Sequence, residues 1–318
     1  MDCPAFGIIV ESSEFEEMLS ATEILPLSKD AFIPENSRDT IERLYAIYSI
    51  LASAPLLDPS PEINSAFTEL VGICIKALPR ETIQEILEDE QIVAITNHFR
   101  QLCASGEFRL ELTWATYVTK NPERTAIELM KFPYYNNYVA LAKMELNAIH
   151  SVLFRAPKRI AFLGSGPLPL TSICLARELI NKGNNQLNPS TSDFTIENYD
   201  IDLEALKISK LLTEQLSDVQ AHLTFHHQDI NSIQDLRKYD VVYLAALVGL
   251  VVSEKRKLIQ QLWKSMSPGS YLVLRSAHSL RKILYPEVET EMLQGFEPVL
   301  VVHPYNEVVN SIVIAKRL

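Results

Sequence analysis

The sequence predicts a two-part α/β protein, with an N-terminal helical bundle over residues 1–156 and a Rossmann-like, doubly wound domain over residues 157–318. Three observations predict this class. Apolar residues recur at helical spacing between residues 39 and 156. After Pro157, short β-rich runs alternate with helical segments, and a glycine-containing loop directly follows the first run. Such alternation predicts a parallel sheet covered by helices.

In the N-terminal half, the apolar positions lie three or four residues apart, as in Ile41, Leu44, Tyr45, Tyr48 and Leu51. This spacing is typical of a helix with one buried face. Proline-bearing segments at residues 55–61, at Pro79 and at Pro122 divide the pattern. Because proline ends or starts helices, we expect several helices rather than one.

The C-terminal half contains six runs of strand character separated by helical segments. The loop at residues 181–193 is rich in Asn, Ser, Gly and Pro, and we expect it on the surface between the first helix and the second strand. The six predicted strands are Arg159–Leu163, Phe194–Tyr199, His222–His226, Asp240–Leu244, Tyr271–Leu274 and Asn310–Ile314.

Composition excludes several classes of function. The net charge is −11 and the pI is about 5.2, without a basic cluster, so we expect no nucleic-acid partner. No apolar stretch approaches the roughly 20 residues of a membrane span, and the N-terminus does not read as a secretion signal. The four cysteines are far apart and lack zinc spacing, which indicates reduced thiols. We therefore expect a cytoplasmic protein with a small-molecule substrate, and leave open whether it forms a homo-oligomer.

The loop Gly164-Ser165-Gly166 lies where a doubly wound sheet binds nucleotides, between the first strand and the following helix. Small residues there let the backbone approach a ligand closely. Asp200 ends the second strand, where a carboxylate commonly binds ribose hydroxyls. Asp229 ends the third strand and suits the exocyclic amine of adenine.

Each of these acids has a structural alternative, because an acid at a strand end also caps the next helix. Asp202 directly precedes a helical run over residues 203–216, so it is better suited to capping that helix than to binding a ligand. Pro169 replaces the third glycine of the dinucleotide fingerprint, and no phosphate-binding GxxxxGK[ST] loop occurs. The pattern suits an adenosyl group without a pyrophosphate, and so predicts an S-adenosylmethionine-binding domain.

Read together, six motifs make the chain similar to the nicotianamine synthase family. The similarity runs from about Glu111 to the C-terminus, while the first hundred residues match only as a helical region. The motifs are Phe132–Tyr138 (FPYYNNY), Ile160–Ser172 (IAFLGSGPLPLTS), Asn198–Asp202 (NYDID), Leu244–Gly249 (LAALVG), Leu274–His278 (LRSAH) and Glu307–Ser311 (EVVNS).

The resemblance implies a transferase that joins three S-adenosylmethionine molecules by moving 3-amino-3-carboxypropyl groups, releasing methylthioadenosine and the metal chelator nicotianamine. It implies no metal in the enzyme, and it extends the cofactor site to Ala246 and Leu247. The sequence departs from the family pattern at Ser279, where glycine is usual, at Asn306, where aspartate is usual, and in the longer loop at residues 181–193.

Such a reaction needs a base, because the attacking α-amine is protonated near neutral pH. On a helical wheel, Glu111 falls inside an apolar arc that includes Leu110, Trp114 and Val118. A carboxylate on such a face is costly unless it is paired or used, so the alternative to catalysis is a structural salt bridge. The resemblance places the family's catalytic glutamate at this position.

Two further groups are candidates for contacts with substrate. Tyr134 and Tyr138 lie four residues apart after Pro133, so both phenols face one side of a helix, with Tyr135 beside them. Tyrosines at this spacing are equally typical of a core. Arg275 and His278 follow the fifth strand, where an arginine could hold an α-carboxylate or form a structural ion pair.

Three functions are therefore compared. The first is a nicotianamine synthase, or a related synthase whose first acceptor is another amino acid such as glutamate. The second is a small-molecule methyltransferase with an unusual N-terminal lid, which would release S-adenosylhomocysteine. The third is a non-catalytic scaffold. Glu111 argues against it, because burying a carboxylate on an apolar face costs stability and a scaffold has little reason to keep it.

Overall fold

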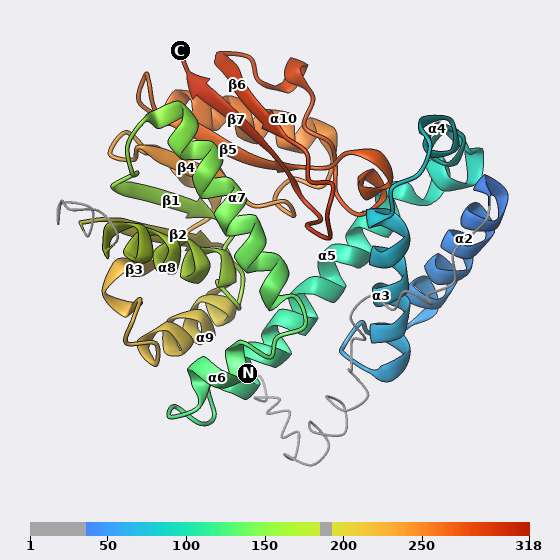
Figure 1. Cartoon of the computed structure of the whole chain (residues 1–318), viewed down its shortest axis with the longest axis horizontal. Coiled ribbons are helices and arrows are strands. Elements are labelled where there is room, and N and C mark those ends of the chain that lie inside the picture. Colours follow the sequence, from blue (N-terminus) through green and yellow to red (C-terminus); the bar gives the residue numbers. More distant parts are fainter. Residues whose placement is uncertain (1–35, 185–192) are drawn as a thin grey trace, which may run out of the picture.

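The structure, a computed structural model, describes residues 36–184 and 193–318. Its centre is a seven-stranded sheet with the order β3-β2-β1-β4-β5-β7-β6 (Figure 1). The strands from β1 to β5 pair in parallel, whereas β7 is antiparallel to both β5 and β6. The strands are β1 (Arg159–Leu163), β2 (Thr195–Asp200), β3 (Leu223–His227), β4 (Val241–Leu244), β5 (Tyr271–Ser276), β6 (Phe296–Val302) and β7 (Ser311–Arg317).

The predicted parallel sheet is present from β3 to β5, and the remaining edge of the sheet is antiparallel. All six predicted strands are present, but the last is antiparallel, and β6 was not predicted. Strand β6 lies at the sheet edge, contains Pro298 and leaves several of its side chains exposed. An edge strand needs no buried apolar run and tolerates proline, so its sequence lacks the pattern that marks a central strand.

Residues 36–156 are mainly helical, as predicted, and helices end or begin at the three predicted proline-bearing breaks. Two further breaks, at Asp89 and at residues 130–134, were not predicted. Ser60 accepts a hydrogen bond from the Ile63 backbone N–H at the start of α3, and Asp89 does the same for the start of α5. Pro79 lies at the N-cap of α4. The helices are α2 (Ser37–Ser53), α3 (Pro61–Ile75), α4 (Arg80–Glu88), α5 (Glu90–Val118), α6 (Thr125–Leu129), α7 (Tyr135–Leu153), α8 (Leu170–Asn184), α9 (Leu203–Glu214) and α10 (Val252–Ser265).

The predicted surface loop at residues 181–193 begins too early in the sequence. Helix α8 continues to Asn184, so the first four residues of that segment are helical. Residues 185–192 of the loop lie outside the described residues, as does Cys3. The other three cysteines are buried and free. Within residues 36–184 and 193–318, no helix is long and apolar enough to cross a membrane.

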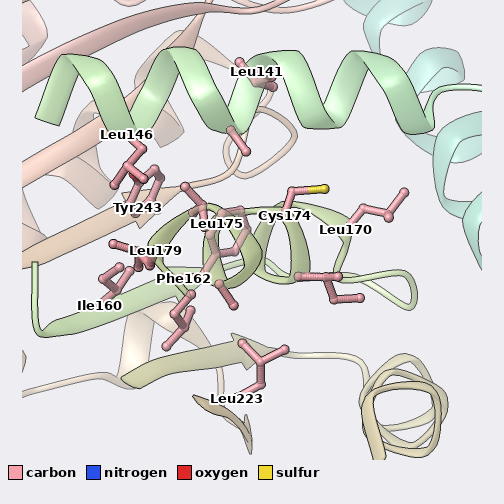
Figure 2. Close-up of a cluster of buried hydrophobic side chains, with 14 of the residues drawn as sticks. Leu141, Leu146, Ile160, Phe162, Leu170, Cys174, Leu175, Leu179, Leu223 and Tyr243 are labelled. Atoms are coloured by element: carbon pink, nitrogen blue, oxygen red, sulfur yellow. The ribbon is translucent and has the colours of Figure 1, made fainter. Parts of the chain in front are cut away.

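Helix α5 joins two hydrophobic cores. Its first half, from Ile92 to Cys103, packs with α2, α3 and α4. Its last turns, at Trp114 and Val118, belong to the core on one face of the sheet, together with α7 and α8. Figure 2 shows this second core, in which side chains of α7 and α8 meet those of β1 and β4. The middle of α5 therefore lies between the helical half and the sheet (Figure 1).

Helix α7 lies before the predicted domain boundary at residue 156, yet Leu141 and Leu146 are buried in the core of the sheet. Its extensive packing against α8 explains why. A third core covers the other face of the sheet, between α10 and the central strands. The boundary at residue 156 marks where strand character begins in the sequence, and as a division between domains it remains a prediction.

Candidate active site

The glycine loop between β1 and α8 has the backbone that its sequence predicts. Gly164 and Gly166 have φ values of +83° and +65°, a region that side-chain-bearing residues rarely adopt. A Cβ added at Gly164 would also lie 2.4 Å from Cγ2 of Val248. The Gly166 N–H donates to Oδ2 of Asp200 at 2.8 Å, so the carboxylate that ends β2 holds the loop in place.

A cavity of about 880 Å³, including its opening to solvent, lies at the carboxyl ends of β1, β2, β4 and β5; we call it the nucleotide cavity. Doubly wound sheets bind ligands at this edge. The nucleotide cavity brings together most of the predicted cofactor residues, together with Glu111, Tyr138 and Arg275. Those cofactor residues are Gly164, Ser165, Gly166, Asp200, Ala246 and Leu247.

The three predicted acids have different positions. Asp200 lines the nucleotide cavity and also accepts from the Asp202 N–H at 2.9 Å. Asp202 caps α9 through the backbone of Glu204 and Ala205, as its alternative role predicted. Asp229 accepts from the Asn231 N–H at 2.9 Å at the start of a short 3-10 turn. It is not among the described residues lining the cavity, and its adenine contact stays a prediction.

A second cavity, of about 1030 Å³ including its opening, lies between α3, α5 and the start of α7; we call it the helical cavity. Apolar side chains such as Phe67, Leu110 and Phe132 form most of its wall. The polar part of the wall includes amides, phenols and carboxylates. Four residues line both cavities, and they mark where the two adjoin: Glu107, Glu111, Tyr138 and Asn310.

Glu111 is buried at this junction, with 8% of its surface exposed. The hydroxyl of Tyr138 lies within hydrogen-bond distance of Oε1 of Glu111, at 2.9 Å. Burial raises the pKa of Glu111 well above its usual range, and the neighbouring carboxylate of Glu107 raises it further. A carboxylate that is hard to ionise, and close to a ligand cavity, is suited to accepting a proton.

The structure places the three predicted tyrosines in different surroundings. Tyr138 contacts both cavities, whereas Tyr134 lines only the helical cavity. Burial and the charge of Glu107 raise the pKa of Tyr134 to about 12, so its phenol remains a donor. Tyr135 faces elsewhere and accepts a hydrogen bond from Arg177 at 3.0 Å. The structure does not bring Tyr135 into either cavity wall.

Arg275 lies within β5 rather than after it, and its guanidinium is already paired. It donates to Oε1 of Glu145 at 3.0 Å and to the Thr171 hydroxyl at 2.7 Å, and the exposed surface of Glu145 is 0%. Although Arg275 lines the nucleotide cavity, these contacts favour the structural ion pair that the sequence left open. A bidentate contact with a substrate carboxylate stays a prediction.

His278 lies after β5, at the start of a 3-10 turn. Its Nδ1 is 2.9 Å from the Ser311 hydroxyl, which also lies 2.9 Å from Nδ1 of His303. Burial, together with the neighbouring Arg281, lowers the pKa of His278 to about 4. Among the described residues that line the two cavities, His278 does not appear, so its contact with substrate stays a prediction.

Sequence reasoning missed several residues of the site. Glu107 lies one helical turn before Glu111, and a wheel extended by one turn places the two carboxylates side by side. Tyr285 donates to Oε2 of Glu107 at 2.8 Å from 178 residues away, which no spacing could predict. Lys255 is 1% exposed and donates to the Ala246 carbonyl at 3.1 Å, so it supports the loop after β4.

The mixed sheet with β7 inserted between β5 and β6, the glycine loop and the cavity at the carboxyl ends define a class: an α/β protein with the fold of S-adenosylmethionine-dependent methyltransferases. Sequence comparison then gives the family. The family described as "Nicotianamine synthase protein" matches residues 33–318, and the chain belongs to this family.

Individual relatives agree with the family assignment. The chain is 37% identical over 281 residues to nicotianamine synthase 2 of Arabidopsis thaliana, covering 87% of this chain and 83% of the relative. It is 37% identical over 284 residues to nicotianamine synthase of Solanum lycopersicum, covering 89% and 85%. The crystal structure of MtNAS in complex with MTA and tNA has the same fold, with a TM-score of 0.73, 22% identity and coverage of 88% and 98%.

Proposed function

We propose that the protein is a nicotianamine synthase, which condenses three S-adenosylmethionine molecules and closes an azetidine ring in the last step. The observation that carries the proposal is the junction of two adjoining cavities at Glu111. An adenosyl donor in the nucleotide cavity and an amine acceptor in the helical cavity would meet there. The names of the relatives support the same activity.

The donor occupies the nucleotide cavity, with its ribose beside Asp200 and its sulfonium close to the glycine loop. Ser165 Oγ and Asn310 Nδ2 are buried and have no hydrogen-bond partner within the described parts of the chain, although both residues line this cavity. Unpaired buried polar groups are costly, so polar atoms of a ligand are suitable partners for them. A mutant of MtNAS, which has the same fold, is known in complex with S-adenosylmethionine, and this supports S-adenosylmethionine as the donor.

In the proposed step, the α-amine of the acceptor attacks the aminopropyl carbon of the donor. A new C–N bond forms, the C–S bond to that carbon breaks, and methylthioadenosine leaves with the electron pair on sulfur. The amine must first lose a proton, which Glu111 accepts. The protein's main contribution is placement, because a sulfonium has three electrophilic carbons and only alignment excludes attack on the methyl group.

The test is to incubate the purified protein with S-adenosylmethionine alone and identify both products by mass spectrometry. The proposal predicts methylthioadenosine together with a product built from three aminocarboxypropyl units. The by-product reports which carbon was attacked, and the amino-acid product reports how many transfers took place.

Two alternatives give different products. S-adenosylhomocysteine would identify a methyltransferase. Methylthioadenosine that appears only after another amino acid, such as glutamate, is added would identify a related synthase with a different first acceptor.

A further inference from the structure

The junction of the two cavities contains more hydrogen-bond contacts than its phenols have hydrogens. The Tyr138 hydroxyl lies 2.9 Å from Oε1 of Glu111 and 3.2 Å from Oε1 of Glu107. The Tyr285 hydroxyl lies 2.8 Å from Oε2 of Glu107. Each phenol has one hydrogen, so two hydrogens serve three contacts. The third contact is a hydrogen bond only if one of the two carboxyl groups carries a proton.

The surroundings decide which carboxyl group holds that proton. Glu107 receives both phenols, one on each oxygen, whereas Glu111 contacts only one. A carboxylate with more donors is easier to keep ionised. Burial raises the pKa of both groups, but hydrogen bonds from Tyr285 and Tyr138 lower that of Glu107. The charge on Glu107 in turn raises the pKa of Glu111.

The other titratable and charged groups that act on Glu107 and Glu111 agree with this assignment. Arg275 of β5 favours the ionised form of each, but it is itself paired with Glu145. Asp200, at the end of β2, opposes ionisation of Glu111. Tyr134 and Cys103 remain protonated, because burial and the charge of Glu107 raise the pKa of each.

We propose that Glu107 and Glu111 share a single proton through the hydroxyl of Tyr138, and that Glu107 is the positioning residue that stores the negative charge while the site is empty. In that state, Glu111 is neutral and donates to Tyr138, which donates to Glu107. This inference rests on the proposed function, in which Glu111 is the base.

The arrangement lets the charge move when it is needed. When a cationic substrate lies against Glu111, the Glu111 proton passes to the Tyr138 oxygen while the Tyr138 proton passes to Oε1 of Glu107. Two O–H bonds break and two form, and no proton enters or leaves. The negative charge has then moved from Glu107 to Glu111, which can accept the proton of the attacking amine.

The test is infrared spectroscopy of the ligand-free protein as a function of pH, because a neutral carboxylic acid has a C=O stretching band separate from that of a carboxylate. Within the part of the chain that the structure describes, the other two buried glutamates are Glu128 and Glu145, which are paired with cations and should not contribute. We expect a neutral-acid band near neutral pH in the unchanged protein, and its loss in Glu111→Gln. In Glu107→Gln, the band should disappear at a lower pH than in the unchanged protein, because the substitution removes the charge that opposes ionisation of Glu111.

The matched control is Glu90→Gln, an exposed position on the same helix, which should leave the band and its pH dependence unchanged. A band that survives in Glu111→Gln, or that keeps its pH dependence in Glu107→Gln, would overturn the inference, as would its absence from the unchanged protein. In Glu107→Gln, the acid limb of the pH profile of kcat/KM should shift to lower pH together with the band. Since the infrared measurement needs no substrate, a failure of the proposed function is distinguishable from a failure of the shared proton.

Discussion

The carboxylate of Glu111 lies against the backbone of Gly166: a Cβ added to that glycine would be 3.0 Å from Oε2 of Glu111. Helix α5, which carries Glu111, therefore reaches the loop that is expected to hold the donor's sulfonium. The proximity explains why a long helix from the N-terminal half belongs to a site built at the edge of the sheet. It also makes Glu111 the first position to test.

Glu111→Gln should reduce product formation by about 10²–10⁴-fold, the usual contribution of a general base, while S-adenosylmethionine still binds. Glutamine is nearly isosteric and its amide can still form the hydrogen bond with Tyr138, but it cannot take a proton. Turnover is measured as methylthioadenosine release, and binding by calorimetry. The control is Glu90→Gln. Full turnover in Glu111→Gln would show that another group is the base.

The raised pKa of Glu111 also makes stability depend on pH. Because the folded state has the higher pKa, it binds more protons than the unfolded chain between the usual glutamate range and the raised value. Stability is therefore lost as pH rises through that window. Glu111→Gln removes this loss, so the variant should resist urea better than the unchanged protein at neutral pH. Below about pH 4, the urea unfolding curves of the variant and the unchanged protein should coincide. An equal difference between the two proteins at neutral pH and below about pH 4 would contradict the assignment.

Asp200→Ala should weaken S-adenosylmethionine binding at least tenfold, which corresponds to ~1.4 kcal/mol. The substitution removes the proposed ribose partner and releases the Gly166 N–H. Asp202→Ala is the matched control, since it removes only a helix cap and should cost about 0.5–2 kcal/mol of stability. Calorimetric titration and urea unfolding separate the two effects. Equal loss of affinity in both variants would show that the effect is general loosening of the loop.

Arg275→Met should destabilise the fold by about 3–5 kcal/mol, because it leaves the buried charge of Glu145 without its partner. Replacing both residues, as Arg275→Met with Glu145→Leu, should cost less than the single change, since no uncompensated charge remains. Urea unfolding of the single and double variants measures this difference. If the single variant keeps full stability but loses substrate affinity, Arg275 binds substrate rather than Glu145.

Ser279→Gly should increase stability by roughly 0.5–1 kcal/mol. Ser279 has a φ of +55°, a conformation that costs a side-chain-bearing residue about 1–2 kcal/mol, and glycine recovers most of this despite its greater freedom when unfolded. This backbone agrees with the expectation, drawn from the resemblance, that glycine is usual at this position. The control is Ser53→Gly, in the last turn of α2, which should reduce stability. Thermal unfolding of both variants decides the matter.

Much of the fold could be predicted because its signals are local. The glycines of the loop at residues 164–166, the prolines that divide the helical half and the alternation after Pro157 each depend on a few adjacent residues. The resemblance added the family, which the comparisons confirmed. The antiparallel edge was missed because β6 is half exposed and lacks the pattern of a buried strand.

The sequence by itself determined the order of most of the elements, the position of the glycine loop and the burial of Glu111, because periodicity and backbone preference act within one or two turns of chain. Only the tertiary structure decided which side chains meet. Arg275 is paired with Glu145 from 130 residues away, and Glu107 with Tyr285 from 178 residues away. Such contacts are set by how α5 and α7 pack against the sheet, and no local pattern in a single sequence contains that packing.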